Sequence, residues 1–238
     1  MQLPIIVNER NFLNISVDCV VFGFDDNQLK VLLIEQDKLS ETHVPMSALP
    51  GDHVYMGEDL DEAANRVLKE LTGIEGLYLK QFHAFGNPNR TKGEKDSQWL
   101  RQVRKDPDAH IVTIGYYSLV RMEDLNPVAS SFAKNIEWID VNDIPELAFD
   151  HNEILDYALE HLRADTENNH ISFELLPKKF TLGQLQQLHE LILDKKLDKR
   201  NFRKSIKKLE ELIPLNEKQT GVYHKPAQLY SFERNEDK

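Results

Sequence analysis

The segment Gly51–Ile74, GDHVYMGEDLDEAANRVLKELTGI, has the residue types and spacing to be considered for metal-assisted chemistry. Helix positions i, i+3 and i+4 share one face, so glutamates at those positions would form an oxygen cage for Mg²⁺. Ions held there would neutralise a pyrophosphate and activate water for attack. In this chain the three positions hold Val67, Glu70 and Leu71. One carboxylate stands where three are needed, so we expect no metal site and no catalytic residues.

The same segment resembles the signature of the Nudix family. That signature runs glycine, five residues, glutamate, seven residues, then Arg-Glu-hydrophobic-x-Glu-Glu-x-Gly-hydrophobic. With Glu58 on the first glutamate, Arg66 falls on the arginine and Glu70 on one helix glutamate, while Val67 and Leu71 replace the other two. The resemblance implies a Nudix fold in which Glu58, Arg66 and Glu70 are remnants. The alternative is a hydrolase of a nucleoside diphosphate-linked substrate such as ADP-ribose, working with displaced acids.

A second group of residues, near the C-terminus, has the chemistry of nucleic-acid recognition. Residues 195–208 include eight basic side chains and one acid, Asp198. The helix face opposite Phe202 and Ile206 carries Lys199, Arg200, Asn201, Arg203, Lys204 and Lys207. Arginine and asparagine make bidentate contacts with base edges, and lysines suit phosphates. We therefore expect binding to double-stranded DNA, with Lys225 of the following hairpin contributing. The alternative is a merely solvated helix face.

The elements that must position the first group mix strands and helices. Residues 17–24 and 29–35 predict a hairpin, and the 47–54 stretch a third short strand. Apolar residues from Leu60 to Leu71 recur with helical spacing, and Gly73 is a helix stop. Residues 77–85, 110–120 and 135–141 predict further strands, and residues 151–164 a second helix. This pattern predicts an α+β fold for residues 1–165.

The elements after residue 165 predict a winged helix. Thr181 and Gln184 form a capping box that starts one helix, and Asp198 is the N-cap of the next. This second helix is expected to bury Phe202, Ile206, Leu209 and Ile213. Two β-runs around Gly221 and Pro226 then complete the order helix, turn, helix, hairpin. We expect a domain over 166–238, joined to the domain over 1–165 by a polar linker at 163–170.

Charge supports this division. Residues 1–170 carry 15 Lys and Arg against 30 Asp and Glu, a net of −15, whereas residues 171–238 carry 14 against 10, a net of +4. A change of sign between segments indicates different partners. No apolar run is long enough for a membrane span, and the single cysteine, Cys19, excludes a disulfide framework. We expect a cytoplasmic protein without a membrane partner.

The full chain resembles the Nudix-related transcriptional regulators of bacteria. The stretches LLPKKFTLGQLQQLHELI, DKRNFRKSI and PAQLYSF look like the winged helix of that family, and VDCVVFGF, AFGNPNR, IGYYSLV and FDHNEILDYA extend the similarity. The family includes regulators of NAD metabolism and of arabinose use. The resemblance implies a degenerate Nudix domain that senses a small ligand and a homodimer that binds operator DNA, with no cofactor.

The ligand is expected between the helix of the Nudix signature and the strands that face it. Candidate lining residues are Asp18, His83, Phe85, Asn87, Arg90 and Tyr117, of which His83 and Tyr117 are equally compatible with core positions. The net charge of −15 disfavours a polyanion, so we favour a sugar or sugar derivative. An ADP-ribose-like nucleotide or another nucleotide sugar, whose pyrophosphate Arg90 would bind, is the alternative. The charged stretch 90–109 is either a surface insertion or a ligand lid. A constitutive DNA-binding protein is the third function class.

Overall fold

The computed structural model describes residues 14–25, 28–36, 46–93, 96, 106, 109–168, 179–221 and 225–232. In the N-terminal part the elements are β1 (Asn14–Phe24), β2 (Leu29–Gln36), β3 (Ser47–Ala48), β4 (Gly51–His53), α1 (Leu60–Thr72), β5 (Lys80–Phe85), β6 (Ile111–Arg121), the short 3₁₀ turn η1 (Met122–Asp124), β7 (Ala133–Asp140) and α3 (His151–Glu167). In the C-terminal part they are α4 (Leu182–Leu193), α5 (Lys199–Ile206), β8 (Leu212–Lys218) and β9 (Gln228–Phe232). The expected α+β fold is confirmed.

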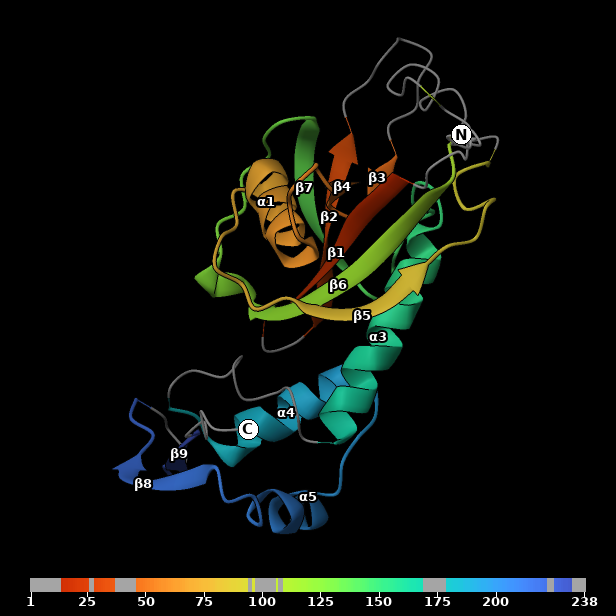
Figure 1. The fold of residues 1–238 in the computed structure, drawn as a ribbon. Helices are drawn as coiled ribbons and strands as arrows, with labels where there is room; N and C mark the ends of the chain where they lie inside the picture. The colour runs from red at the N-terminus through yellow and green to blue at the C-terminus, as the bar shows by residue number, and fades with distance from the viewer. Residues whose placement is uncertain are drawn as a thin grey trace, which may run out of the picture.

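A seven-stranded mixed sheet organises the N-terminal part. Its path runs β3-β2-β1-β6-β5, with β4 paired to β1 and β7 to β2. The predicted hairpin of β1 and β2 forms, with Phe22 opposite Val31. β1 also pairs in parallel with β6, and each paired residue lies 97 positions later in the chain, as in Asn14 opposite Ile111. Figure 1 shows α1 on one face of this sheet and α3 on the other.

Side-chain alternation along the strands divides the interior into two apolar clusters. One cluster contains Val17, Cys19 and Tyr116 and packs beneath α1. The other contains Val20, Phe22 and Tyr117 from the opposite face and packs beneath α3. The second cluster continues without interruption into the C-terminal part, where α4, α5 and β9 contribute to it. The two parts of the chain therefore share one core.

Capping boxes start both α1 and α4, and that of α4 lies where the sequence predicts. Asp59 and Glu62 form a capping box at α1, and Gly73 ends that helix in the left-handed conformation with φ 69°. Thr181 and Gln184 form the box of α4. These bonds satisfy backbone groups that a helix end leaves without partners.

The structure corrects two expectations about helix ends. α3 continues to Glu167, so the linker prediction was wrong for residues 163–167, which are helical, and the expected domain boundary falls inside a helix. α5 ends at Ile206, so Leu209 lies beyond it and Ile213 belongs to β8. In the last turns of α3 the side chains of Leu162 and Thr166 are buried, and this packing extends the helix through polar residues.

Candidate functional site

The helix with the Nudix signature turns Val67 and Leu71 into the core. Both side chains are buried, with exposed fractions of 0% and 1%, in the cluster that includes Val17 and Tyr116. Glu70 lies on the solvent side of the same helix, with 47% of its side chain exposed. Among the residues that the structure describes, no group of three or more His, Cys, Asp or Glu side chains is arranged to hold a metal ion.

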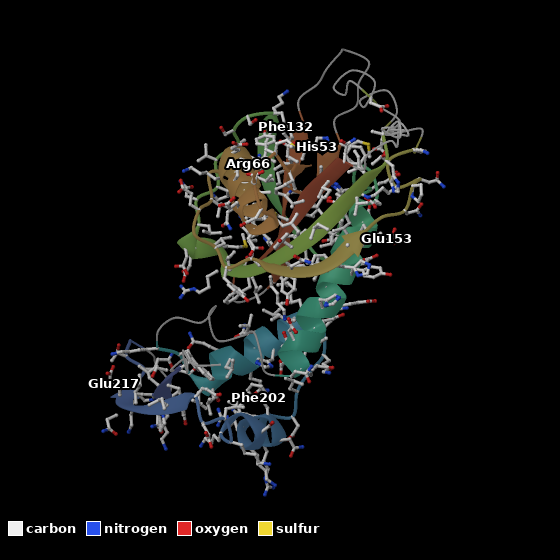
Figure 2. The ribbon with its side chains drawn as sticks, in the orientation of Figure 1. His53, Arg66, Phe132, Glu153, Phe202 and Glu217 are labelled. Carbon is white, nitrogen blue, oxygen red and sulfur yellow. The ribbon has the colours of Figure 1, made fainter. Side chains whose placement is uncertain are left out.

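The remaining charged residues of the signature are engaged with one another. The Arg66 guanidinium donates to both carboxylate oxygens of Glu58, at 2.6 and 3.0 Å, and to Glu70 at 3.1 Å. It also donates to the His53 carbonyl at 2.8 Å and stacks 3.8 Å from the Tyr55 ring centroid. Figure 2 shows Arg66 on α1 beside His53. The hydrogen bonds from Arg66 lower the pKa of Glu58, which therefore stays ionised as the arginine's partner.

The expected ligand residues lie on the face of the sheet away from α1. Phe85 and Tyr117 belong to the cluster beneath α3, and the Tyr117 hydroxyl donates to Asp165 of that helix. The His83 ring lies 4.9 Å from the Tyr157 ring of α3. The expectation of a pocket between these residues and α1 was therefore wrong, because the sheet separates the residues from that helix. Binding of a ligand by the residues themselves stays a prediction.

Asp18 and Arg90 come together in a buried polar network at the start of α3. Arg90 donates to both oxygens of Asp150, at 2.8 and 2.7 Å, and approaches Asp18 at 3.5 Å. The Thr113 hydroxyl donates to Asp18 at 2.7 Å. Only 5% of the Arg90 side chain is exposed, so water screens these charges weakly. The network joins β1, β6 and the loop after β5 to α3.

His151 completes this network as a neutral ring. Its Nδ1 accepts the Leu49 N–H at 2.9 Å, and its Nε2 lies 3.5 Å from Asp18. Burial lowers the pKa of His151. Sequence reasoning missed Asp150 and His151 as partners of Asp18 and Arg90, since both lie far away in the chain. Asn87 is exposed and accepts the Asn89 N–H, so it shapes the loop.

The basic side chains of α5 lie in the open, as the sequence predicts. Phe202 and Ile206 are buried, with the Phe202 ring 5.2 Å from His189 of α4, and they turn the other face outward. Figure 2 shows Phe202 directed toward α4. That outward face carries Lys199, Arg200, Arg203, Lys204 and, at the C-cap, Lys207, all exposed. In the described part of the chain none of these five cations pairs with an acidic side chain.

The helix start and the wing frame this basic surface. The Asp198 carboxylate accepts the Asn201 N–H at 2.8 Å, which confirms its role as the N-cap. Asn201 itself is exposed on the first turn. β8, which follows α5 in the chain, pairs antiparallel with β9, and exposed Lys225 precedes β9. Tyr223 and His224 of this hairpin lie outside the described residues, as do Trp99, Leu100 and Val103 of the charged stretch.

Comparison with known proteins assigns both parts of the chain. Residues 13–161 match the NUDIX domain model, and residues 172–232 match the NrtR DNA-binding winged helix domain model. The chain is 31% identical over 222 residues to the ADPR responsive transcriptional repressor NtrR of Acinetobacter baylyi, covering 91% of this chain and 81% of that protein.

Two solved structures extend the similarity. Shewanella oneidensis NrtR complexed with a 27mer DNA shares 26% identity and a TM-score of 0.69, over 92% of this chain and 93% of the other. The NUDIX domain of that NrtR complexed with ADP ribose shares 25% identity and a TM-score of 0.52, over 66% of this chain and 92% of the other. Among the described residues, no helix is long and apolar enough to span a membrane.

Proposed function

Because the chain belongs to the NrtR family of Nudix-related transcriptional regulators, we propose that it binds operator DNA through α5 and its wing, and ADP-ribose through its Nudix domain. The effector changes the affinity for DNA, and two copies of the chain occupy one operator. The single observation that supports DNA binding best is the exposed face of α5. Five cations there have no acidic partner among the residues that the structure describes, and they lie beside Asn201.

The exposed face of α5 suits the major groove of DNA. Side chains in the first turns of such a helix contact base edges, and lysines further along reach phosphates. A solvated helix in a protein of net charge −11 has acids available to pair with. Five cations that pair with no acid in the described part of the chain therefore favour a polyanionic partner. Arg200, Asn201 and Arg203 supply the base contacts, and Lys199, Lys204, Lys207 and Lys225 the phosphate contacts.

For the effector, the relatives outweigh the expectation of a plain sugar. The repressor of Acinetobacter baylyi is named as ADPR responsive, and the Nudix domain of the Shewanella protein is complexed with ADP ribose. ADP-ribose contains two ribose groups, so sugar recognition is retained within the larger ligand. The argument from net charge fails because local cations, and not the total, set the field at a site.

We further propose that the Nudix domain senses ADP-ribose without hydrolysing it. A Mg²⁺ cage needs several carboxylate oxygens, and burial of Val67 and Leu71 leaves that helix face apolar. Arg66 forms ion pairs with the two retained glutamates, Glu58 and Glu70. Neither carboxylate can bind a metal ion without losing its ion pair.

Calorimetric titration of the full chain with ADP-ribose, L-arabinose and ribose 5-phosphate tests the effector. A duplex selected by the protein from a random-sequence pool serves as the DNA probe, with and without the preferred compound. We expect ADP-ribose to bind with micromolar affinity or tighter and to change the affinity for the duplex. Binding of arabinose alone would return the assignment to a sugar sensor, and no effect of any compound on DNA affinity would favour a constitutive DNA-binding protein.

A further inference from the structure

A polar cleft separates the sheet from the helix-turn-helix. Its volume is about 460 Å³. One wall comes from the turn before β2, the end of β7 and Arg163 of α3, and the other from α4 and the turn that follows it. Its three cations, Arg163, Lys195 and Lys196, all have partners already. Lys195 and Lys196 pair with carboxylates, and Arg163 donates to a backbone carbonyl. The cleft lies between the effector domain and the helices proposed to bind DNA.

Two residues near the C-terminal end of α3 bind the end of α4 and the turn after it, beside this cleft. Arg163 donates through Nε to the Ile192 carbonyl at 3.1 Å, and the Glu167 carboxylate accepts from Lys195 at 2.7 Å. Arg163 and Glu167 are four positions apart, so they share one face of the helix. We call these two side chains and their two partners the α3 clasp. A cation at a helix C-terminus is favourable, because the last carbonyls there lack partners within the helix.

The same turn of α3 is attached to the sheet on its other side. Asp165 accepts from Lys80 of β5 and from the Tyr117 hydroxyl of β6. At the other end of α3, Arg90 donates two hydrogen bonds to Asp150, the N-cap residue before the helix. Figure 1 shows the helix running from the sheet to α4. These contacts connect α3 to β5, to β6 and to the Arg90 network.

The turn between α4 and α5 is in turn tied firmly to α4. Glu190 accepts the Leu197 N–H at 3.0 Å and pairs with Lys196 at 3.1 Å, and Gln186 donates to the Leu197 carbonyl at 3.0 Å. One residue later Asp198 caps α5. A shift of the end of α4 thus passes to the DNA-binding helix without a flexible segment in between.

We propose that the α3 clasp transmits the state of the Nudix domain to α5, so that effector binding reorients the DNA-binding helix by moving the end of α4. This inference rests on the proposed function for the identity of the effector. Packing alone gives α3 and α4 a shared apolar interface, through Leu162 and Leu188 among others. The clasp sets how the two helices lie on that interface, since apolar contact has no preferred direction.

The test is the double variant Arg163→Ala/Glu167→Ala in the full chain. It removes one positive and one negative charge, so the net charge that attracts DNA is unchanged. The matched control is Lys69→Ala/Glu75→Ala, which removes an exposed ion pair of 3.2 Å at the far end of α1 and is equally neutral. Affinity for the selected duplex is measured with and without saturating ADP-ribose, and affinity for ADP-ribose by calorimetry.

In the wild type and the control we expect ADP-ribose to change DNA affinity by about 5- to 150-fold. In the clasp variant this ratio should fall to within about twofold of one, while the affinities for ADP-ribose alone and for DNA alone stay within about threefold of the wild type. A clasp variant that keeps the wild-type ratio overturns the inference. Should the double variant lose its helical circular dichroism, Glu167→Gln/Lys195→Gln removes the exposed ion pair alone and again leaves the net charge unchanged.

A second measurement separates this inference from the proposed function. Amide hydrogen exchange at Lys195 and Leu197 reports how firmly the turn is held, without any ligand or DNA. We expect exchange there to accelerate by about tenfold in the clasp variant and to stay unchanged in the control. If the wild type ignores ADP-ribose, the effector assignment fails, and accelerated exchange still supports the clasp. Unchanged exchange overturns the clasp whatever the effector is.

Discussion

Arg203 and Lys207 lie on the same exposed side of the DNA-binding helix but at different depths for a duplex. Arg203 is in the second turn of α5, and Lys207 is at its C-cap. We predict that Arg203→Ala costs about 1–3 kcal/mol of binding free energy on the best site and relaxes preference at one base pair. Lys207→Ala should weaken binding to all sequences alike and lower the salt slope by about one unit. Affinities for selected and scrambled duplexes over a salt series decide between these roles, and equal, salt-insensitive effects would show that α5 does not enter the groove.

At the same scale, burial of Val67 and Leu71 predicts the absence of hydrolysis. Incubated with ADP-ribose or nucleoside triphosphates and Mg²⁺ or Mn²⁺, the protein should release no product above background. Enzymes commonly turn over at about 1 per second or faster, so a rate of that order would contradict the prediction. Loss of such a rate in Glu70→Gln would then place the chemistry on the remaining acids of α1.

Among the elements, α4 has a start whose stability can be measured. The Thr181 hydroxyl accepts a hydrogen bond from the Gln184 N–H at 3.2 Å, and the Gln184 side-chain oxygen accepts one from the Thr181 N–H. Thr181→Ala should lower the free energy of unfolding by about 1 kcal/mol, because it leaves a helix N–H without its partner. Thr181→Ser is the control, since serine retains the hydroxyl. Urea unfolding of the two variants should differ by that amount, and equal midpoints would mean that water replaces the cap without loss.

α4 also predicts a dependence of stability on pH. Burial lowers the pKa of His189 to about 4 from the ordinary 6.5. Between pH 4 and 6.5 His189 is protonated in the unfolded chain but neutral in the folded chain. The free energy of unfolding should therefore fall as the pH drops from 6.5 toward 4. The contribution is at most about 3 kcal/mol. The slope of unfolding free energy against pH reports the difference in bound protons between the unfolded and folded states. In His189→Gln this difference should be smaller over the same pH window by up to one proton. An unchanged slope would assign the acid sensitivity to other groups.

The elements also show where sequence reasoning succeeds. Caps and stops are local, and Gly73, Thr181 and Asp198 lie at the helix ends where the sequence predicts them. Pairings between distant residues are not local. Arg90 and Asp150 are 60 positions apart, and no short pattern joins them. The strand residues Tyr116 and Tyr117 are neighbours of identical type, yet one packs beneath α1 and the other beneath α3. The face that each tyrosine reaches depends on the register of β6 in the sheet, which its pairing with β1 sets.

For the whole molecule we predict a two-fold dimer on DNA. A winged helix of roughly 70 residues has too small an interface with DNA for tight specific binding, and dimers pair half-sites about one helical turn apart. Sedimentation at micromolar concentration should give twice the mass of the 27.6 kDa chain, and the selected duplex should contain an inverted repeat. A monomer both alone and on the duplex would contradict this prediction, as would a selected site without two-fold symmetry.

The apolar cluster beneath α3 has a consequence for modularity. Leu162 belongs to the effector half by position and Leu185 to the DNA-binding half, yet both are completely buried in the same cluster. The winged helix is consequently not an interchangeable cassette. In a chimera that joins a foreign DNA-binding half to this effector half, the apolar side chains of the shared cluster would be either exposed or packed too tightly. To be soluble, such a hybrid must carry the second half of α3 together with the donor's α4, so the natural crossover point for recombination lies within α3 rather than after it.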